Sequence, residues 1–168
     1  MSRAFVKESD DAGSDLPDRP QSLHPNYVTP AGLRMLQQAV DALESERRPL
    51  AGKKDDPIKG QRLGIIDRDL RYFHGRIEHA ILVDITIQQD DRVLFGATVG
   101  VEDENGNALE FTIVGEDEAD VARNKVSWVS PLANALIGAS IGDSVKWHRP
   151  AGDMELEISS IKYIQESI

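Results

Sequence analysis

Two stretches in the first half of the chain have the apolar spacing of amphipathic helices. Apolar residues recur every three or four positions, first at Leu33, Leu36, Val40 and Leu43 and then at Leu63, Ile66, Leu70, Phe73 and Ile77. Each set lies on one helical face, so the two stretches predict an antiparallel coiled-coil hairpin. Thr29 and Pro30 predict its start, because a hydroxyl N-cap followed by Pro is typical of helix N-termini. Pro57 cannot donate a hydrogen bond within a helix and predicts a tip near 53–60.

From Ala80 onward the pattern changes to short runs rich in β-branched residues, which predict strands. The sequence ENGN supplies a hairpin turn between two of these runs. The sequence SPLANALIG predicts a short helix, with Ser130 as its N-cap and Pro131 at its first position. Five or six strands and one helix predict an antiparallel α+β module over residues 83–168.

The N-terminal segment, residues 1–28, has no sustained apolar period and is rich in Ser, Asp, Pro and Gly. This composition predicts an extended or disordered tail. A short docking motif around Phe5 is the alternative interpretation. The chain is therefore expected to consist of this tail, the hairpin over residues 29–82 and the C-terminal module.

Charge is distributed unevenly over these three parts. The 168 residues carry a formal net charge of −10, with −2 in the tail, +2 in the hairpin and −10 in the C-terminal module. The overall acidity argues against free duplex DNA as the main partner, because binding DNA requires neutralising its phosphates. The chain has no cysteine and four scattered His, which exclude disulfides and disfavour zinc. With neither a membrane-spanning run nor a signal peptide, it is expected to be cytoplasmic.

Several motifs of the C-terminal module resemble the GreA/GreB family of bacterial transcription elongation factors. They are FGATV at 95–99, IVGEDEAD at 113–120 and SWVSPLANALIGASIGD at 127–143. In the helical half, YVTPAGLRML, ERRPL and LGIIDRDLRYF resemble GreB-like members, so the resemblance covers residues 27–164. It implies an N-terminal antiparallel coiled coil and a C-terminal domain of FKBP-like fold.

The resemblance also implies a partner. Such factors dock on the rim of the secondary channel of RNA polymerase, and the coiled coil enters that channel. The docking residues carried over to this chain are Ser130, Pro131, Leu132 and Ala133. In cleavage-competent members, two acidic tip residues help to hold a magnesium ion that activates water to cut backtracked RNA. The resemblance thus implies a monomeric accessory factor that is not an enzyme, with the nascent RNA 3′ end as a further candidate partner. It has no cofactor of its own, apart from magnesium shared with the polymerase.

The hairpin tip departs from the family pattern. By comparison with the family, each arm lacks about seven residues, which shortens its reach by about 10 Å and preserves the heptad seam, similar to the short-armed relative Rnk. The acidic tip motif is missing, and the candidate metal ligands are Asp55 and Asp56 alone. The surrounding bases are Arg47, Arg48, Lys53, Lys54, Lys59 and Arg62. Because these cations oppose a bound metal ion, the sequence predicts weak or no stimulation of transcript cleavage.

Three other functions remain open from the sequence. The first is a true transcript cleavage factor that uses Asp55 and Asp56. The second is an FKBP-type prolyl isomerase, which requires an apolar, aromatic-lined pocket. Its candidate aromatic residues are Phe95, Phe111, Trp128, Trp147 and Tyr163, of which the first, third and fourth lie in predicted strands and are expected in the core. The third is a helical-hairpin interaction module unrelated to polymerase.

Overall fold

The computed structural model describes residues 16–53, 55–88 and 91–165, which fall into two compact units. The first unit contains Gln37–Glu78 together with the N-terminal segment up to Gln21. The second contains Ser22–Leu36 and the chain from His79 onward. Phe5 and its candidate docking motif lie outside the described residues. Within the described ranges, no helix is long and apolar enough to cross a membrane.

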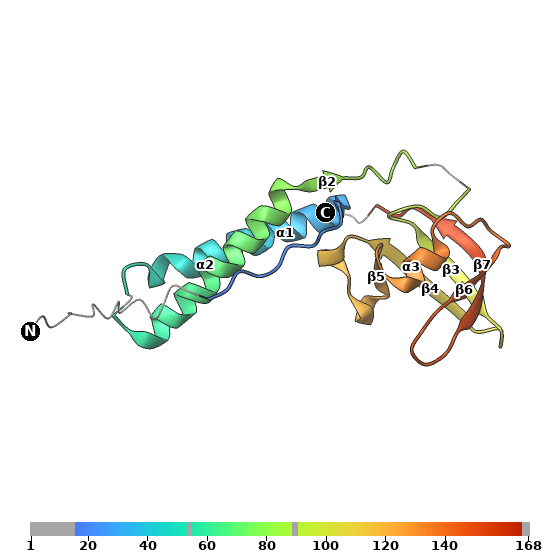
Figure 1. Cartoon of the computed structure of the whole chain (residues 1–168). Helices are drawn as coiled ribbons and strands as arrows, with labels where there is room; N and C mark the ends of the chain where they lie inside the picture. Colours follow the sequence, from blue (N-terminus) through green and yellow to red (C-terminus); the bar gives the residue numbers. More distant parts are fainter. Residues whose placement is uncertain (1–15, 54, 89–90, 166–168) are drawn as a thin grey trace, which may run out of the picture. The chain divides into compact units, whose positions relative to one another are not determined.

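The two apolar stripes form the predicted helical hairpin (Figure 1). Helix α1 spans Pro30–Leu50 and helix α2 spans Pro57–Glu78. Val40, Ile66 and Leu70 are buried in their seam, and the partly buried residues around them are Leu43, Leu50, Phe73 and Ile77. Pro49 lies in the last turn of α1, where its missing N–H and its ring favour the end of the helix one residue later.

The C-terminal unit is built on a five-stranded sheet with strand order β5-β4-β3-β7-β6. Strand β3 (Thr98–Asp103) pairs antiparallel with β4 (Ala108–Val114) and with β7 (Met154–Lys162), which in turn pairs with β6 (Ser144–Trp147). The expected purely antiparallel sheet is wrong at one edge, because β5 (Lys125–Ser127) runs parallel to β4. Two 3₁₀ turns, η1 (Glu116–Glu118) and η2 (Val121–Arg123), connect these strands. They reverse the chain and bring it back beside Thr112, so that β5 runs alongside the last three residues of β4.

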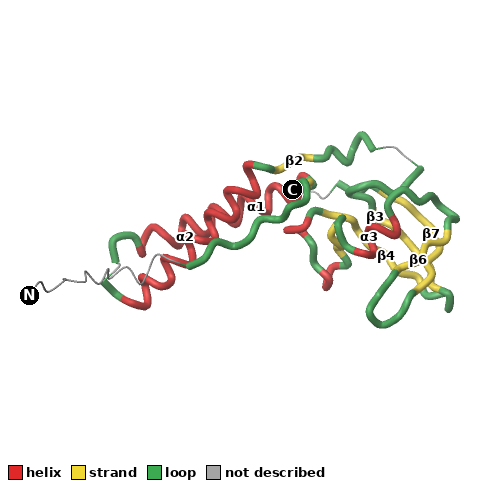
Figure 2. Tube along the Cα trace, viewed as in Figure 1, coloured by secondary structure: helices red, strands yellow, loops and turns green. Residues whose placement is uncertain are grey.

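One face of this sheet packs against the short helix α3 (Pro131–Leu136), which confirms the helix predicted from SPLANALIG (Figure 2). Leu132, Ala133 and Leu136 of α3 are buried against inward-facing strand residues. The strand residues at the centre of this core are Val99, Val101, Ile113, Leu156 and Ile158. Alternation of buried and exposed positions along β7 places its glutamates on the opposite face of the sheet.

A second, two-stranded sheet was not predicted from the sequence. Strand β1 (Asn26–Val28), from the predicted tail, pairs in parallel with β2 (Ala80–Leu82). The strand expected over ILVDITI is therefore much shorter than predicted. Asp84 explains its early end, since Asp84 Oδ1 accepts hydrogen bonds from the N–H of Thr86 (2.9 Å) and from its hydroxyl (2.6 Å), which is a turn conformation.

Candidate functional site

The hairpin tip is the first candidate site, and Asp56 there is the N-cap of α2. The N–H groups of Ile58 and Lys59 donate to Asp56 Oδ1 over 3.1 and 3.3 Å, and Lys59 Nζ lies 3.1 Å from Oδ2. Pro57 takes the first helical position, as is common after a capping residue. The side-chain hydrogen bond from Lys59 is the main cause of a lowered pKa of Asp56. Both carboxylate oxygens are therefore already engaged.

The capping role of Asp56 can be tested by substitution. Asp56→Ala is expected to lower the thermal midpoint of the helical circular dichroism signal, because two N–H groups of the first turn lose their acceptor. Asp56→Asn keeps an acceptor oxygen and is expected to melt close to the parent at neutral pH. A lowered folded-state pKa means that the carboxylate stabilises the hairpin above its usual pKa and loses this effect as the pH falls below about 4. The parent should therefore lose more helix stability than Asp56→Asn on acidification, and equal losses would contradict the assignment.

The other predicted acid at the tip, Asp55, is not part of a cluster of metal-ligating side chains in the described part of the chain. Asp55 is exposed, and the described residues contain no group of three or more His, Cys, Asp or Glu side chains placed to hold a metal ion. Magnesium prefers near-octahedral coordination by oxygen. Asp56 already caps a helix, so Asp55 is the one of the two tip carboxylates without such a structural role among the described contacts.

Three of the six predicted basic residues at the tip, Arg47, Lys59 and Arg62, form ion pairs. Arg47 Nε of α1 lies 2.6 Å from Asp67 Oδ1 of α2, and Arg62 of α2 contacts both carboxylate oxygens of Glu46 over 2.6 and 2.7 Å. The hydrogen bond from Arg62 lowers the pKa of Glu46. These pairs join the two helices across the hairpin, so part of the basic charge is neutralised. Arg48 and Lys53 are exposed, and Lys54 lies outside the described residues.

The α3 segment is the second candidate site, and only part of it is accessible. Ser130 is the N-cap of α3, since its hydroxyl accepts a hydrogen bond from the N–H of Ala133 (3.2 Å). Leu132 and Ala133 are 3% and 0% exposed, so their side chains belong to the core and cannot contact a partner. Pro131 is exposed, and Asn134 is a neighbouring exposed residue that the sequence analysis did not select. The helical spacing of three residues places both on the outer face of α3.

The acidic loop between β4 and β5 also holds a site that the sequence analysis missed. Glu118 accepts a hydrogen bond from the hydroxyl of Thr29 (2.6 Å), which itself accepts one from the N–H of Gly32 (2.9 Å). Lys125 Nζ lies 3.8 Å from the other carboxylate oxygen of Glu118, and both side chains are largely buried. A Cβ atom on Gly32 would lie 2.6 Å from Glu118, so the glycine permits this approach. Glu118 therefore anchors the first turn of α1.

The aromatic residues considered for prolyl isomerisation are used in packing. Phe111 and Trp147 meet edge to face with ring centroids 6.1 Å apart, and both pack against the core. The hydroxyl of Tyr163 donates to the carbonyl of Arg92 (2.9 Å) and accepts from the N–H of Leu94 (3.1 Å). Trp128 contacts the ring of Tyr27 at 5.1 Å between centroids. A cavity near Thr29 and Gly96 has a volume of only about 30 Å³, far below what a peptide ligand needs.

A helical hairpin and a sheet with a capped helix on one face define a class of protein with a coiled-coil part and a globular α+β part. The family model "Transcription elongation factor, GreA/GreB, C-term" matches residues 88–163. Transcription elongation factor GreB of Neisseria meningitidis is 40% identical over 155 residues, covering 83% of this chain and 95% of the relative. GreA of Trichlorobacter lovleyi is 44% identical over 151 residues, covering 81% and 96%. The chain belongs to the GreA/GreB family of transcription elongation factors.

Solved structures of similar proteins include GreA factor homolog 1 (Gfh1) of Thermus thermophilus. It is 20% identical, with a TM-score of 0.40, and the match covers 83% of this chain and 99% of that one. The Neisseria GreB match also bears on chain length. It spans 155 residues, whereas 83% of this chain is about 139 residues, so about 16 positions of the match have no counterpart in this chain.

Proposed function

We propose that this protein is an accessory factor that binds bacterial RNA polymerase at the secondary channel in the cytoplasm and regulates elongation with weak or no stimulation of transcript cleavage. Membership of the GreA/GreB family supports the polymerase as partner. The observation that carries the second part is the engagement of Asp56 as a helix cap and as the ion-pair partner of Lys59. The protein acts as a monomer and has no metal of its own.

The chemistry of the tip supports weak cleavage activity. A carboxylate that helps to hold a catalytic magnesium ion must present free oxygens to it. Asp56 directs one oxygen to helix N–H groups and the other to Lys59 Nζ, and a cation at 3.1 Å opposes a second positive ion. Shortened arms further reduce the reach of these acids by about 10 Å each. The tip is therefore suited to occupying the channel more than to supplying metal ligands.

The exposed face of α3 is proposed as the docking surface. Asn134→Arg, which places a long cation on this face, is expected to weaken polymerase binding at least tenfold without changing the unfolding midpoint, because Asn134 is exposed. Biolayer interferometry with immobilised core polymerase measures the affinity. Asn105→Arg, in the exposed turn between β3 and β4, is the matched control and should bind as the parent does. Equal affinities for the two variants would place the docking surface elsewhere.

The alternative of true transcript cleavage predicts a different result at the tip. If Asp55 and Asp56 hold the metal, Asp55→Ala combined with Asp56→Asn removes cleavage while leaving polymerase binding and the helix cap in place. If the tip acts only by occupancy, the same double variant behaves as the parent in cleavage assays. A hairpin module unrelated to polymerase predicts no binding in the interferometry experiment.

A further inference from the structure

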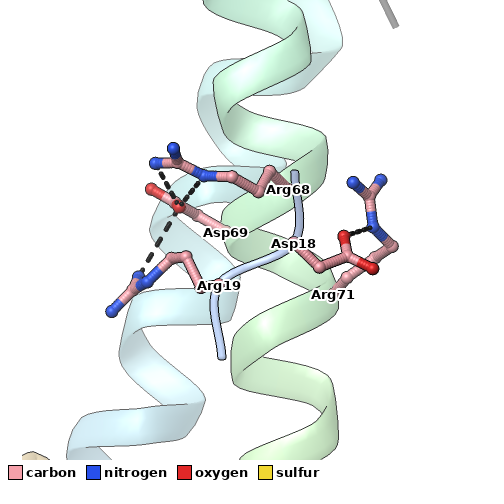
Figure 3. A network of polar contacts seen from close by, with 5 residues as sticks. All are labelled: Asp18, Arg19, Arg68, Asp69 and Arg71. Atoms are coloured by element: carbon pink, nitrogen blue, oxygen red, sulfur yellow. Dashed lines mark hydrogen bonds and ion pairs between the residues drawn. The ribbon is translucent and has the colours of Figure 1, made fainter. Parts of the chain in front are cut away.

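The segment Leu16–Gln21, within the predicted tail, contacts helix α2 through Asp18, Arg19 and Gln21, and Figure 3 shows the first two of these contacts. Asp18 Oδ1 accepts a hydrogen bond from Arg71 Nε over 2.7 Å. Arg19 lies 3.5 Å from Asp69, which is also held by Arg68 at 2.9 Å. The side-chain amide of Gln21 donates to the backbone carbonyl of Tyr72 over 3.0 Å. These contacts all fall on the part of α2 between Asp69 and Tyr72, and we call Leu16–Gln21 the strap.

Arg19 is the anchor of the strap. Its guanidinium carbon lies 3.8 Å from the centroid of the Tyr72 ring and 5.3 Å from that of Phe73. The Arg19 side chain is 38% exposed and the Asp69 side chain 21%, so this contact is better shielded than the Asp18–Arg71 pair, at 70% and 52%. Stacking of a partly buried guanidinium on an aromatic ring contributes more stabilising free energy than an exposed ion pair does.

Helix α2 is adapted to this contact at Gly75. Glycine in a helix interior is unfavourable relative to alanine, so its presence requires a local reason. A Cβ atom on Gly75 would lie 3.0 Å from the side-chain nitrogen of Gln21. The glycine therefore leaves the space in which the strap amide reaches the Tyr72 carbonyl.

Helix α2 is more buried than α1, as expected if a further segment of the chain covers α2. In the part of α1 that belongs to the hairpin unit, Gln37–Leu50, ten of 14 residues are exposed, as expected for a helix covered on one face. On α2, every residue from Leu63 to Phe73 except Arg71 is buried or half-buried. A single partner helix does not cover a helix all round. The strap contributes cover on a second face of α2.

The sequence of the strap favours the extended conformation before it binds. Pro17 and Pro20 fix their own backbone φ angles, and each disfavours helical geometry at the residue before it, namely Leu16 and Arg19. An extended segment with two prolines loses less conformational entropy on binding than a flexible one. The anchoring residue Arg19 is itself one of the residues restricted in this way.

We propose that α2 carries a binding site for the chain's own N-terminal segment, an extended Asp-Arg pair flanked by prolines, and that this strap stabilises the shortened hairpin. The hairpin unit buries four apolar side chains among its described residues, Val40, Leu63, Ile66 and Leu70, for two helices of about twenty residues each. In proteins most helix stability comes from tertiary packing of the apolar face, so further contacts on α2 add to it. The strap precedes residue 27, where the family resemblance begins, and supplies packing that a longer coiled coil would obtain from additional heptads. This inference does not depend on the proposed function.

Hydrogen exchange on the full-length protein tests the strap. Arg19→Ala is expected to raise the exchange rates of α2 amides between residues 66 and 76 about five- to tenfold, because the anchoring contact to Tyr72 and Asp69 is lost. Arg19→Lys keeps the charge but loses the planar stack, and it should give a smaller increase. Arg48→Ala removes an exposed arginine from the same unit and should change these rates less than twofold.

A double-substitution cycle separates the contact from a general loss of stability. If Arg19 acts through Tyr72, then Arg19→Ala combined with Tyr72→Ala should raise exchange little more than Tyr72→Ala alone. Amides of the sheet over residues 98–162 serve as the internal reference and should not change. The inference is overturned if Arg19→Ala exchanges like Arg48→Ala, or if the effects of Arg19→Ala and Tyr72→Ala multiply as independent changes do.

Discussion

Leu136→Ala is expected to lower the free energy of unfolding of the C-terminal domain by about 3 kcal/mol, the largest single-residue effect on stability that we predict. Leu136 is 0% exposed and packs from α3 onto the central strands of the sheet. Removing its side chain deletes buried methyl groups and leaves a cavity between helix and sheet. The outer face of α3 with Pro131 and Asn134 depends on this anchor, so polymerase binding should weaken as well.

Urea unfolding of the full-length protein, followed by tryptophan fluorescence, measures this effect. Both tryptophans, Trp128 and Trp147, lie in the C-terminal unit, so the signal reports on that unit alone. Leu109→Ala is the matched control, because Leu109 of β4 is 37% exposed and should cost less than about 1 kcal/mol. Similar midpoints for the two variants would show that α3 is not held by the packing described above.

Features encoded by local spacing could be predicted from the sequence. The apolar residues around Val40 and Ile66 recur with the helical period, which places them on one face of each helix. This placement depends on local spacing alone. Ser130 followed by Pro131 predicts a capped helix, because the capping hydrogen bond joins residues only three apart. The fold class was therefore accessible before any tertiary information.

Features that depend on contacts between distant residues could not be predicted in this way. The parallel pairing of β5 with β4 follows from the course of the η1 and η2 turns, which no short pattern specifies. The same holds for the strap, since nothing near Arg19 in the sequence identifies the Tyr72 ring as its partner. Composition indicates only that the strap cannot form a core of its own.

Two sequence signals carry more than one meaning. Asp56 is a candidate metal ligand by its charge, and an Asp directly before a Pro-initiated helix is equally a capping signature, which its hydrogen bonds confirm. The sequence segment from Ser130 to Ala133 resembles a docking motif as a whole. The helical period separates its residues, because Leu132 and Ala133 face the core while Pro131 and Asn134 face outward.

The second large effect is expected in transcription. At saturating concentration the protein should reduce GreB-stimulated transcript cleavage at least tenfold. The reason is that two factors that bind in the same channel exclude each other. Asn134→Arg should require at least tenfold more protein for the same reduction, whereas Asn105→Arg should compete as the parent does. Failure to compete at any concentration would contradict binding at the channel.

The central claim is that the protein occupies the polymerase channel without delivering a metal-binding tip. Its most direct test is a transcript cleavage assay on stalled, backtracked elongation complexes, with magnesium present and this protein as the only added factor. The account predicts that the RNA keeps its length at the intrinsic rate of the polymerase, while interferometry shows that the complexes are occupied. Prompt shortening of the RNA that is lost in the Asp55→Ala and Asp56→Asn double variant would contradict it.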